Sequence, residues 1–285
     1  MKQASLLSFP NNWKNAAAEA TEKFTNSANT AFSSNPIFKQ GKPVAKICLC
    51  LTAKTLRRDL AILDKYRKYA DLAELRVDCL DPDERLLIRR FPEMAGLPII
   101  LTIRRKVDGG LFESGEGARI NLMARGLAYA DADKRRNFAY LDIEEDITVP
   151  SLEEAANTFG TRIIRSYHNF TDTDEDLSAK IRTMHRSAGD IVKIAIMANS
   201  TKDVLKLLRA GKENVKQDTI LTAMGHYGTC SRILAEHFGS LLSYTCAYSE
   251  PEISQASPGQ IDVQDLAQLY RFRNITHATK VYGVT

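Results

Sequence analysis

A lysine in the middle of an apolar segment is the residue of this chain that most clearly could do chemistry. Lys193 lies within residues 191–197, an apolar, β-branched run that follows a Gly-Asp turn and is typical of a buried strand. Burying an ammonium group without a partner is costly, and the usual outcome favours the neutral amine. Since a neutral amine attacks carbonyl carbons, Lys193 is a candidate for covalent chemistry. The alternative is a lysine whose stem packs while its ammonium reaches water at the strand end.

Further titratable and charged residues interrupt other apolar runs. They are Glu74, Arg76 and Asp78 in residues 74–78, Arg104 at the end of residues 98–104, Asp142 in residues 140–143, and His168 at the end of residues 163–168. A histidine base and several arginines, together with an amine, suit a reaction at a carbonyl of an anionic substrate. Structural roles are the alternative: Glu74 could form a buried salt bridge with Arg76 or Arg104, and a lone histidine is often only structural.

The elements that must position these residues follow a regular order. Apolar, β-rich runs begin near Lys46, Leu72, Pro98, Phe138, Thr161, Asp190, Asp218 and Leu241, and helical patterns between or after them cover residues 56–69, 118–132, 174–187 and 262–272. Eight strands that alternate with helices over about 240 residues predict a (β/α)8 barrel. The alternative, an open doubly wound sheet, is less favoured because no Gly-x-Gly-x-x-Gly follows the first strand.

In such a barrel, alternate residues of each strand point inward. This alternation assigns Glu74, Arg104, Asp142, His168 and Lys193, which come from five different strands, to the barrel interior near the carboxyl ends. Barrel active sites are built at that end from several strands. The segment after the third strand, residues 105–110, is polar and ends in two glycines, so we interpret it as a mobile loop over the mouth or as a long linker.

The first 43 residues differ in composition from the rest. Residues 1–43 are rich in Asn, Ala, Ser and Thr, and apolar residues recur at spacings of three or four from Trp13 to Phe32. This pattern indicates a weakly amphipathic helix that ends at Pro36 and Pro43. We therefore predict an N-terminal extension, residues 1–43, that is helical or only partly ordered, and a catalytic barrel domain, residues 44–285.

Composition excludes several classes of function. The net charge of +4 is too small, and the basic residues too scattered, to predict nucleic-acid binding. No apolar stretch approaches membrane-spanning length, and the N-terminus has no signal-peptide core, so we expect no membrane partner. The five cysteines are odd in number and form no Cys-x-x-Cys pair, which favours reduced thiols in a cytoplasmic protein over disulfides or zinc.

Six segments, in order, resemble the type I 3-dehydroquinate dehydratases of the shikimate pathway. They are residues 74–78 (Glu-Leu-Arg-Val-Asp), 101–104 (Leu-Thr-Ile-Arg), 166–170 (Ser-Tyr-His-Asn-Phe), 192–195 (Val-Lys-Ile-Ala), Met224-Gly225 through Ser231-Arg232, and 257–260 (Ser-Pro-Gly-Gln). The resemblance implies a (β/α)8 barrel that acts as a homodimer on the small molecule 3-dehydroquinate. It further implies dehydration to 3-dehydroshikimate, the third step of the pathway to aromatic amino acids, without cofactor or metal.

The resemblance also implies a role for individual residues. Lys193 is similar to the lysine that forms a Schiff base with the substrate ketone, and His168 to the general acid/base. Arg232 resembles the arginine that binds the substrate carboxylate. Substrate contacts are further implied for Glu74, Arg76 and Arg104, which bind ring hydroxyls and hold the surroundings of the lysine, and for Gln260 on the closing loop.

Two positions depart from the family pattern. Cys50 stands where many members have serine, and Ser257 directly precedes Pro258, where the usual order is Ser-Ala-Pro. Whether Cys50 and Ser257 supply the usual contacts is open, as is the role of Asp142. Two other functions remain alternatives: a Schiff-base aldolase for sugar phosphates, which would need a phosphate cradle, and a non-catalytic barrel that binds a small acid.

Overall fold

The computed structural model describes residues 45–282 except 129, 251–252, 254–255 and 277. The helix predicted for the N-terminal extension and the domain boundary at residues 43 and 44 lie outside the described residues. The described strands, all parallel, are β1 (Lys46–Leu51), β2 (Leu72–Arg76), β3 (Ile99–Thr102), β4 (Tyr140–Glu144), β5 (Arg162–Asn169), β6 (Ile191–Met197), β7 (Thr219–Met224), β8 (Leu242–Cys246) and β9 (Ile261–Asp262). The first eight start within two residues of the predicted positions.

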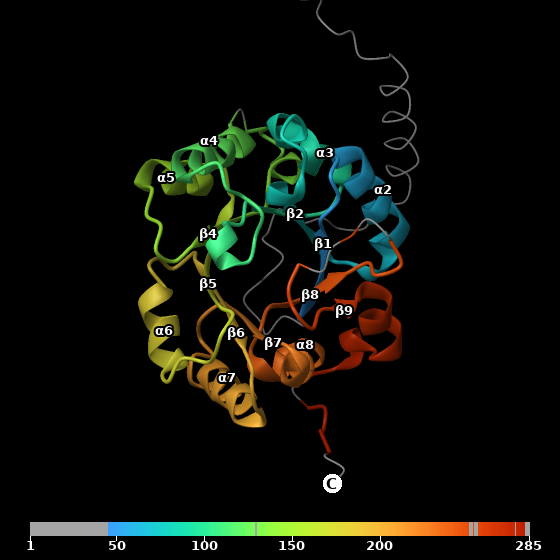
Figure 1. Cartoon of the computed structure of the whole chain (residues 1–285), viewed down its shortest axis with the longest axis vertical. Coiled ribbons are helices and arrows are strands. Elements are labelled where there is room, and N and C mark those ends of the chain that lie inside the picture. Colours follow the sequence, from blue (N-terminus) through green and yellow to red (C-terminus); the bar gives the residue numbers. More distant parts are fainter. Residues whose placement is uncertain (1–44, 129, 251–252, 254–255, 277, 283–285) are drawn as a thin grey trace, which may run out of the picture. The chain divides into compact units, whose positions relative to one another are not determined.

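The strands form one curled sheet in the order β7-β6-β5-β4-β3-β2-β1-β8-β9. The first and last barrel strands are neighbours, because Lys46 of β1 pairs with Leu242 of β8. A single bridge between Thr219 and Ser240 joins β7 to the start of β8, and the amide of Leu241 donates to the carbonyl of Thr219 at 2.8 Å. Helices surround this ring of strands (Figure 1), so the predicted (β/α)8 barrel is confirmed.

The described helices are α2 (Leu56–Tyr66), α3 (Phe91–Ala95), α4 (Glu116–Leu127), α5 (Pro150–Thr158), α6 (Leu177–Met184), α7 (Thr201–Glu213) and α8 (Thr229–Ile233). Short 3-10 turns extend several connections, among them η2 (Val77–Cys79), η3 (Glu84–Arg90), η4 (Lys106–Asp108) and η6 (His226–Gly228). The helix predicted from residue 174 is shorter, because Asp176 caps α6 by accepting from the amide of Ala179 at 2.8 Å.

The helix predicted over residues 262–272 is shorter and mostly of the π type. This segment contains the end of β9, a π-helical turn, η8 (Asp265–Leu269), and a 3-10 turn, η9 (Phe272–Asn274). The side chain of Asp262 accepts from the amide of Gln264, as at the start of a helix, and Arg271, with a left-handed φ of 50°, follows the end of the helical segment.

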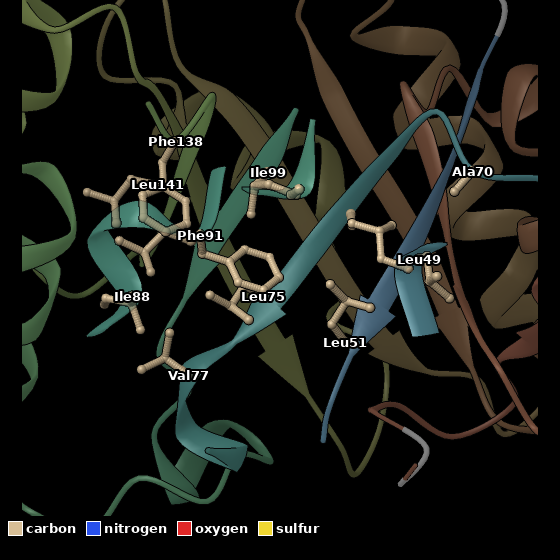
Figure 2. Close-up of a cluster of buried hydrophobic side chains, with 14 of the residues drawn as sticks. Leu49, Leu51, Ala70, Leu75, Val77, Ile88, Phe91, Ile99, Phe138 and Leu141 are labelled. Atoms are coloured by element: carbon tan, nitrogen blue, oxygen red, sulfur yellow. The ribbon is translucent and has the colours of Figure 1, made fainter. Parts of the chain in front are cut away.

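The outer face of the strands carries the main apolar core. Leu49, Leu75 and Leu141 belong to one buried apolar cluster that also contains Ile88 and Phe91, which precede β3 (Figure 2). Each such side chain contributes roughly 1.5–3 kcal/mol when it is fully buried. Because this packing fixes which residues point outward, the alternate residues must point into the barrel, where most of the charged side chains of the strands lie.

Candidate active site

All eight residues predicted for the site line one cavity at the carboxyl ends of the barrel strands. They are Glu74, Arg76, Arg104, His168, Lys193, Arg232, Ser257 and Gln260. They come from β2, β5 and β6, from the segment after β3, from α8, and from the loop after β8. Residues up to 186 positions apart in the sequence are therefore brought together, as the strand alternation predicts.

Lys193 is buried, but its ammonium has partners. Its Nζ donates to Asp142 Oδ2 at 2.9 Å and lies 3.6 Å from Glu74 Oε1. It also lies 4.3 Å from the centroid of the Tyr244 ring. Two carboxylates and an aromatic ring therefore surround the amine. Strands β2 and β4 supply the carboxylates, Glu74 and Asp142, so the amine is buried with partners and does not reach water at the strand end.

Asp142 stays ionised despite its burial. Burial alone would raise its pKa, but Arg104 and Lys193, helped by a hydrogen bond from Ser166, hold the pKa of Asp142 far below its usual range. Arg104 Nη2 lies 2.8 Å from Asp142 Oδ1, while Lys193 contacts the other oxygen. The carboxylate therefore joins the lysine to an arginine that follows the neighbouring strand β3.

His168 follows Ser166 on the inner face of β5, and Ser166 pairs directly with Lys193 of β6. Burial, followed by the positive charges of Arg104 and Lys193, lowers the pKa of His168 well below 6.5, although Asp142 opposes this effect. Its Nδ1 atom is buried and has no hydrogen-bond partner among the described residues. A neutral imidazole with an unused nitrogen is suited to accept a proton at neutral pH.

Neither arginine of the inner face forms a salt bridge with Glu74. Arg76 makes two parallel hydrogen bonds to Asp78, at 3.0 and 2.8 Å. Asp78 lies in the turn η2, beyond the end of β2, and not on the strand as the pattern predicted. Arg104, which also lines the cavity, contacts Glu144 through its Nη1 at 2.7 Å. Glu74 instead accepts hydrogen bonds from Cys50 of β1 and from Thr102 of β3.

Arg232 is only 2% exposed and carries donors without partners. Its Nη2 donates to the hydroxyl of Ser257 at 2.9 Å and to the carbonyl of Pro258 at 3.0 Å. Its Nε and Nη1 have no partner among the described residues. Burial lowers the pKa of Arg232 to about 10, so the guanidinium remains charged at neutral pH. Arg232 therefore does not face solvent, and its free donors suit an anion.

Cys50 forms two polar contacts through its thiol. Its thiol donates to Glu74 Oε2 at 3.2 Å and accepts from Gln260 Nε2 at 3.2 Å. Burial first, and then Glu74, raise the pKa of Cys50 well above its ordinary value, so the thiol stays protonated. Gln260 also accepts from the amide of Ala256 at 2.9 Å. Cys50 therefore connects the inner carboxylate to the loop that carries Gln260.

The loop of Ser257 to Gln260 packs directly on the turn after β7. The amide of Gly225 donates to the carbonyl of Pro258 at 3.2 Å. Gly259 has a φ of 75°, and a Cβ at this residue would lie 2.8 Å from the carbonyl oxygen of Gly225, so glycine is required there.

Asp108 and Tyr244 are among the cavity residues that were not predicted for the site. Asp108, from η4 in the loop after β3, accepts a hydrogen bond from Arg105 at 2.6 Å. Residues 105–110 were interpreted as a loop over the mouth or a linker, but no periodic pattern distinguishes Asp108 from the other residues of that loop. Tyr244 lies in β8, and the alternation used for the other strands would have found it.

Among the described residues, no group of three or more His, Cys, Asp or Glu side chains is arranged to hold a metal ion. No described helix is long and apolar enough to cross a bilayer.

Comparison with known proteins gives a consistent result. Residues 47–277 match the family "Type I 3-dehydroquinase". The chain is 31% identical over 227 residues to the 3-dehydroquinate dehydratase of Methanococcus vannielii, which covers 78% of this chain and 97% of that protein. It is 30% identical over 233 residues to the same enzyme of Methanocaldococcus jannaschii, with 80% and 99% covered. The crystal structure of 3-dehydroquinate dehydratase from Geobacillus kaustophilus has a TM-score of 0.69 at 25% identity, with 81% and 91% covered.

Proposed function

Because this chain belongs to the type I 3-dehydroquinase family, we propose that it is a lyase that converts 3-dehydroquinate to 3-dehydroshikimate through a Schiff base on Lys193. The observation that carries the proposal is that an amine, a neutral histidine and an arginine with unused donors line one cavity. An amine suits the ketone, a histidine suits proton transfer, and an arginine suits the carboxylate of this substrate.

The first steps concern Lys193. Its ammonium gives up a proton, the amine attacks the ketone carbon, and water leaves as the protonated imine forms. This cation occupies the place of the ammonium, beside Asp142 and over the Tyr244 ring, so both groups stabilise it. The imine withdraws electrons from the neighbouring carbon and makes its proton far more acidic than that of the ketone.

His168 then transfers the protons. Its neutral imidazole removes the proton from the carbon next to the imine, and the electron pair of that C–H bond forms an enamine. The enamine expels the hydroxyl group one carbon further on, and the imidazolium returns the proton, so that water leaves. A second water hydrolyses the imine, which releases the unsaturated ketone and restores the amine of Lys193.

The remaining residues bind the substrate or organise the cavity. Arg232 binds the carboxylate, since its free donors lie in a buried pocket where an anion is attracted strongly. Arg76, Gln260 and Glu74 provide donors and acceptors for ring hydroxyls. Ser257 contributes through Arg232, whose Nη2 donates to the Ser257 hydroxyl. Arg104 acts mainly on the ionisation of Asp142.

The proposed reaction needs no cofactor. Placement in the third step of the shikimate pathway, in the cytoplasm and as a homodimer, belongs to the same proposal and rests on the family resemblance. Neither alternative has an observation in its favour: a sugar-phosphate aldolase would require a phosphate on the substrate, and a binding protein would form no covalent adduct.

Borohydride trapping tests the proposal. Incubation with 3-dehydroquinate and borohydride should add one reduced substrate mass at Lys193, located by peptide mapping, and should inactivate the protein. Lys180, whose side chain is about a quarter exposed and pairs with Glu145, provides the control variant Lys180→Met, which should still react. An adduct on another lysine, or turnover without any adduct, would contradict the mechanism.

A further inference from the structure

A line of buried charges of alternating sign connects the outer helix α4 to Lys193. Its members are Arg119, Glu144, Arg104, Asp142 and Lys193, and each is at most 7% exposed. Arg119 comes from α4, whereas Glu144, Asp142 and Lys193 lie on strands and Arg104 directly follows β3. Consecutive members are in direct contact. A change of charge at Arg119 therefore alters the electrostatic potential at Lys193 through a series of short contacts.

The contacts are short at each step. Arg119 Nη1 donates to Glu144 Oε2 at 2.6 Å, and Glu144 Oε1 accepts from Arg104 Nη1 at 2.7 Å. Arg104 Nη2 lies 2.8 Å from Asp142 Oδ1, and Asp142 Oδ2 accepts from Lys193 Nζ at 2.9 Å. Each carboxylate thus uses one oxygen for the residue before it and the other for the residue after it.

Arg119 is fixed at the outer end. Its Nη1 also donates to the carbonyl of Ile103 at 3.0 Å, and its Nη2 to Glu116 at 2.6 Å. Its residue exposure is 0%, and neither Arg119 nor Glu144 lines the cavity. Neither residue is therefore placed to touch a substrate.

We propose that Arg119 and Glu144 are positioning residues for the proposed reaction, which fix the place and the charge state of the Lys193 amine through Arg104 and Asp142. The inference rests on the proposed function, because it assigns these residues a part in generating the nucleophile. A purely structural ion cluster would stabilise the fold but would leave the reactivity of Lys193 unchanged.

The alternation of sign gives opposite expectations for the two residues. Loss of the charge of Arg119 leaves Glu144 uncompensated and makes the surroundings of Lys193 more negative, which retains its proton. Loss of the charge of Glu144 leaves Arg104 uncompensated and makes the surroundings more positive, which releases the proton. The remaining titratable or charged groups that face Lys193 are Glu74, His168, Tyr244 and Cys48, and they are the same in all variants.

The test measures the amine without 3-dehydroquinate. Reductive methylation with formaldehyde and cyanoborohydride requires the neutral amine, and peptide mass mapping over a range of pH gives the midpoint of the reaction at Lys193. Arg119→Gln should move this midpoint upward by about 0.5 pH unit or more, and Glu144→Gln should move it downward by a similar amount. Arg119→Lys keeps the charge and should restore most of the wild-type midpoint.

Arg165 provides the matched control. It is also only 1% exposed and pairs with two carboxylates, Glu153 and Asp190, but it lies on the outer face of β5. Arg165→Gln should lower thermal stability as Arg119→Gln does and leave the midpoint unchanged. If Arg119→Gln does not fold, Glu144→Gln and Arg119→Lys still carry the comparison.

Turnover of 3-dehydroquinate is measured in parallel. Arg119→Gln should lower kcat at neutral pH about tenfold with little change in KM, and higher pH should restore kcat. If the midpoints of Arg119→Gln and Glu144→Gln both equal that of the wild type, or if both move in the same direction, the inference is overturned. Opposite shifts in a protein that does not dehydrate 3-dehydroquinate would support the inference about the amine and overturn only the proposed function.

Discussion

The ammonium of Lys193 lies 4.3 Å from the centroid of the Tyr244 ring, and the Tyr244 hydroxyl has no hydrogen-bond partner among the described residues. Burial, followed by the charge of Glu74, raises the pKa of Tyr244 well above 10, so the phenol is neutral. The ring face and the hydroxyl therefore make separable contributions.

Replacing Tyr244 separates these contributions. Tyr244→Phe keeps the ring and removes a buried hydroxyl without a partner, so kcat/KM should stay within about threefold of wild type and stability should not fall. Tyr244→Leu removes the cation–π contact, worth about 1–2 kcal/mol in a desolvated site, and should lower kcat/KM about tenfold. Steady-state kinetics and borohydride trapping measure both effects. A larger loss in Tyr244→Phe would mean that the hydroxyl takes part in the reaction.

His168 sets the acid limb of the pH profile. Because burial and then the charge of Arg104 lower the pKa of His168 well below 6.5, the imidazole remains a base as the pH falls, and kcat/KM for 3-dehydroquinate should decline only well below pH 6.5. His168→Ala should still form the borohydride-trapped adduct and should dehydrate about 10²–10⁴-fold more slowly. Near wild-type turnover in His168→Ala would assign the base elsewhere, with Asp142 or Glu74 next to be tested.

Arg232→Ala should weaken kcat/KM by about 2–4 kcal/mol, because a charge-assisted contact in a buried pocket is lost. Arg232→Lys keeps the charge without the planar fork and should recover activity only in part. A substrate analogue without the carboxylate should be nearly indifferent to both changes. Equal losses for the analogue and the substrate would show that Arg232 maintains the loop, and that the carboxylate is bound by another residue such as Arg76.

Cys50→Ser should keep most activity, since a hydroxyl can donate to Glu74 and accept from Gln260 as the thiol does. Cys50→Ala removes both contacts and should raise KM several-fold while the fold is retained. Steady-state kinetics on both variants checks this. If Cys50→Ser lost as much activity as Cys50→Ala, the size of the sulfur atom, and not its hydrogen bonds, would be what the site requires.

Asp59 couples stability to pH. This buried residue accepts from the amide of Ala53 at 3.0 Å, and burial raises its pKa from 3.8 to about 8. Between about pH 4 and 8 the folded state therefore holds a proton on Asp59 that the unfolded state has released. The contribution of Asp59 to the free energy of unfolding accordingly falls as the pH rises through that window.

Asp59→Asn should consequently be less dependent on pH than wild type. The difference in unfolding free energy between the two proteins should change by a few kcal/mol between about pH 4 and 8, in favour of the variant at high pH. Denaturant unfolding at several pH values measures it. Asp176→Asn, at the exposed N-cap of α6, is the control and should not show this change. Parallel pH curves for Asp59→Asn and wild type would refute the prediction.

The order of eight apolar runs and the helical patterns between them predicted the barrel, and the alternation of residues along each strand predicted the inward residues, because burial constrains every strand in the same way. Lys193 and His168 were placed by this rule alone, and Tyr244 could have been. The partners of Arg76 and Arg104 could not be predicted, since a side chain of several rotatable bonds reaches carboxylates on its own and on neighbouring strands. Asp108 and the contact between Cys50 and Gln260 depend on loop conformation, which no periodicity encodes.

Arg232 is shared between the closing loop and the proposed ligand. Its Nη2 is bound by Ser257 and Pro258, and Pro258 also accepts from Gly225, so the carboxylate contact and the loop contacts meet at one guanidinium. A bound anion would neutralise the guanidinium of Arg232, which the loop covers. It would thereby lengthen the residence time of the ligand that lies beneath the loop. Inhibitors of this protein should accordingly gain slow dissociation from an anionic group placed against Arg232, more than from added apolar surface.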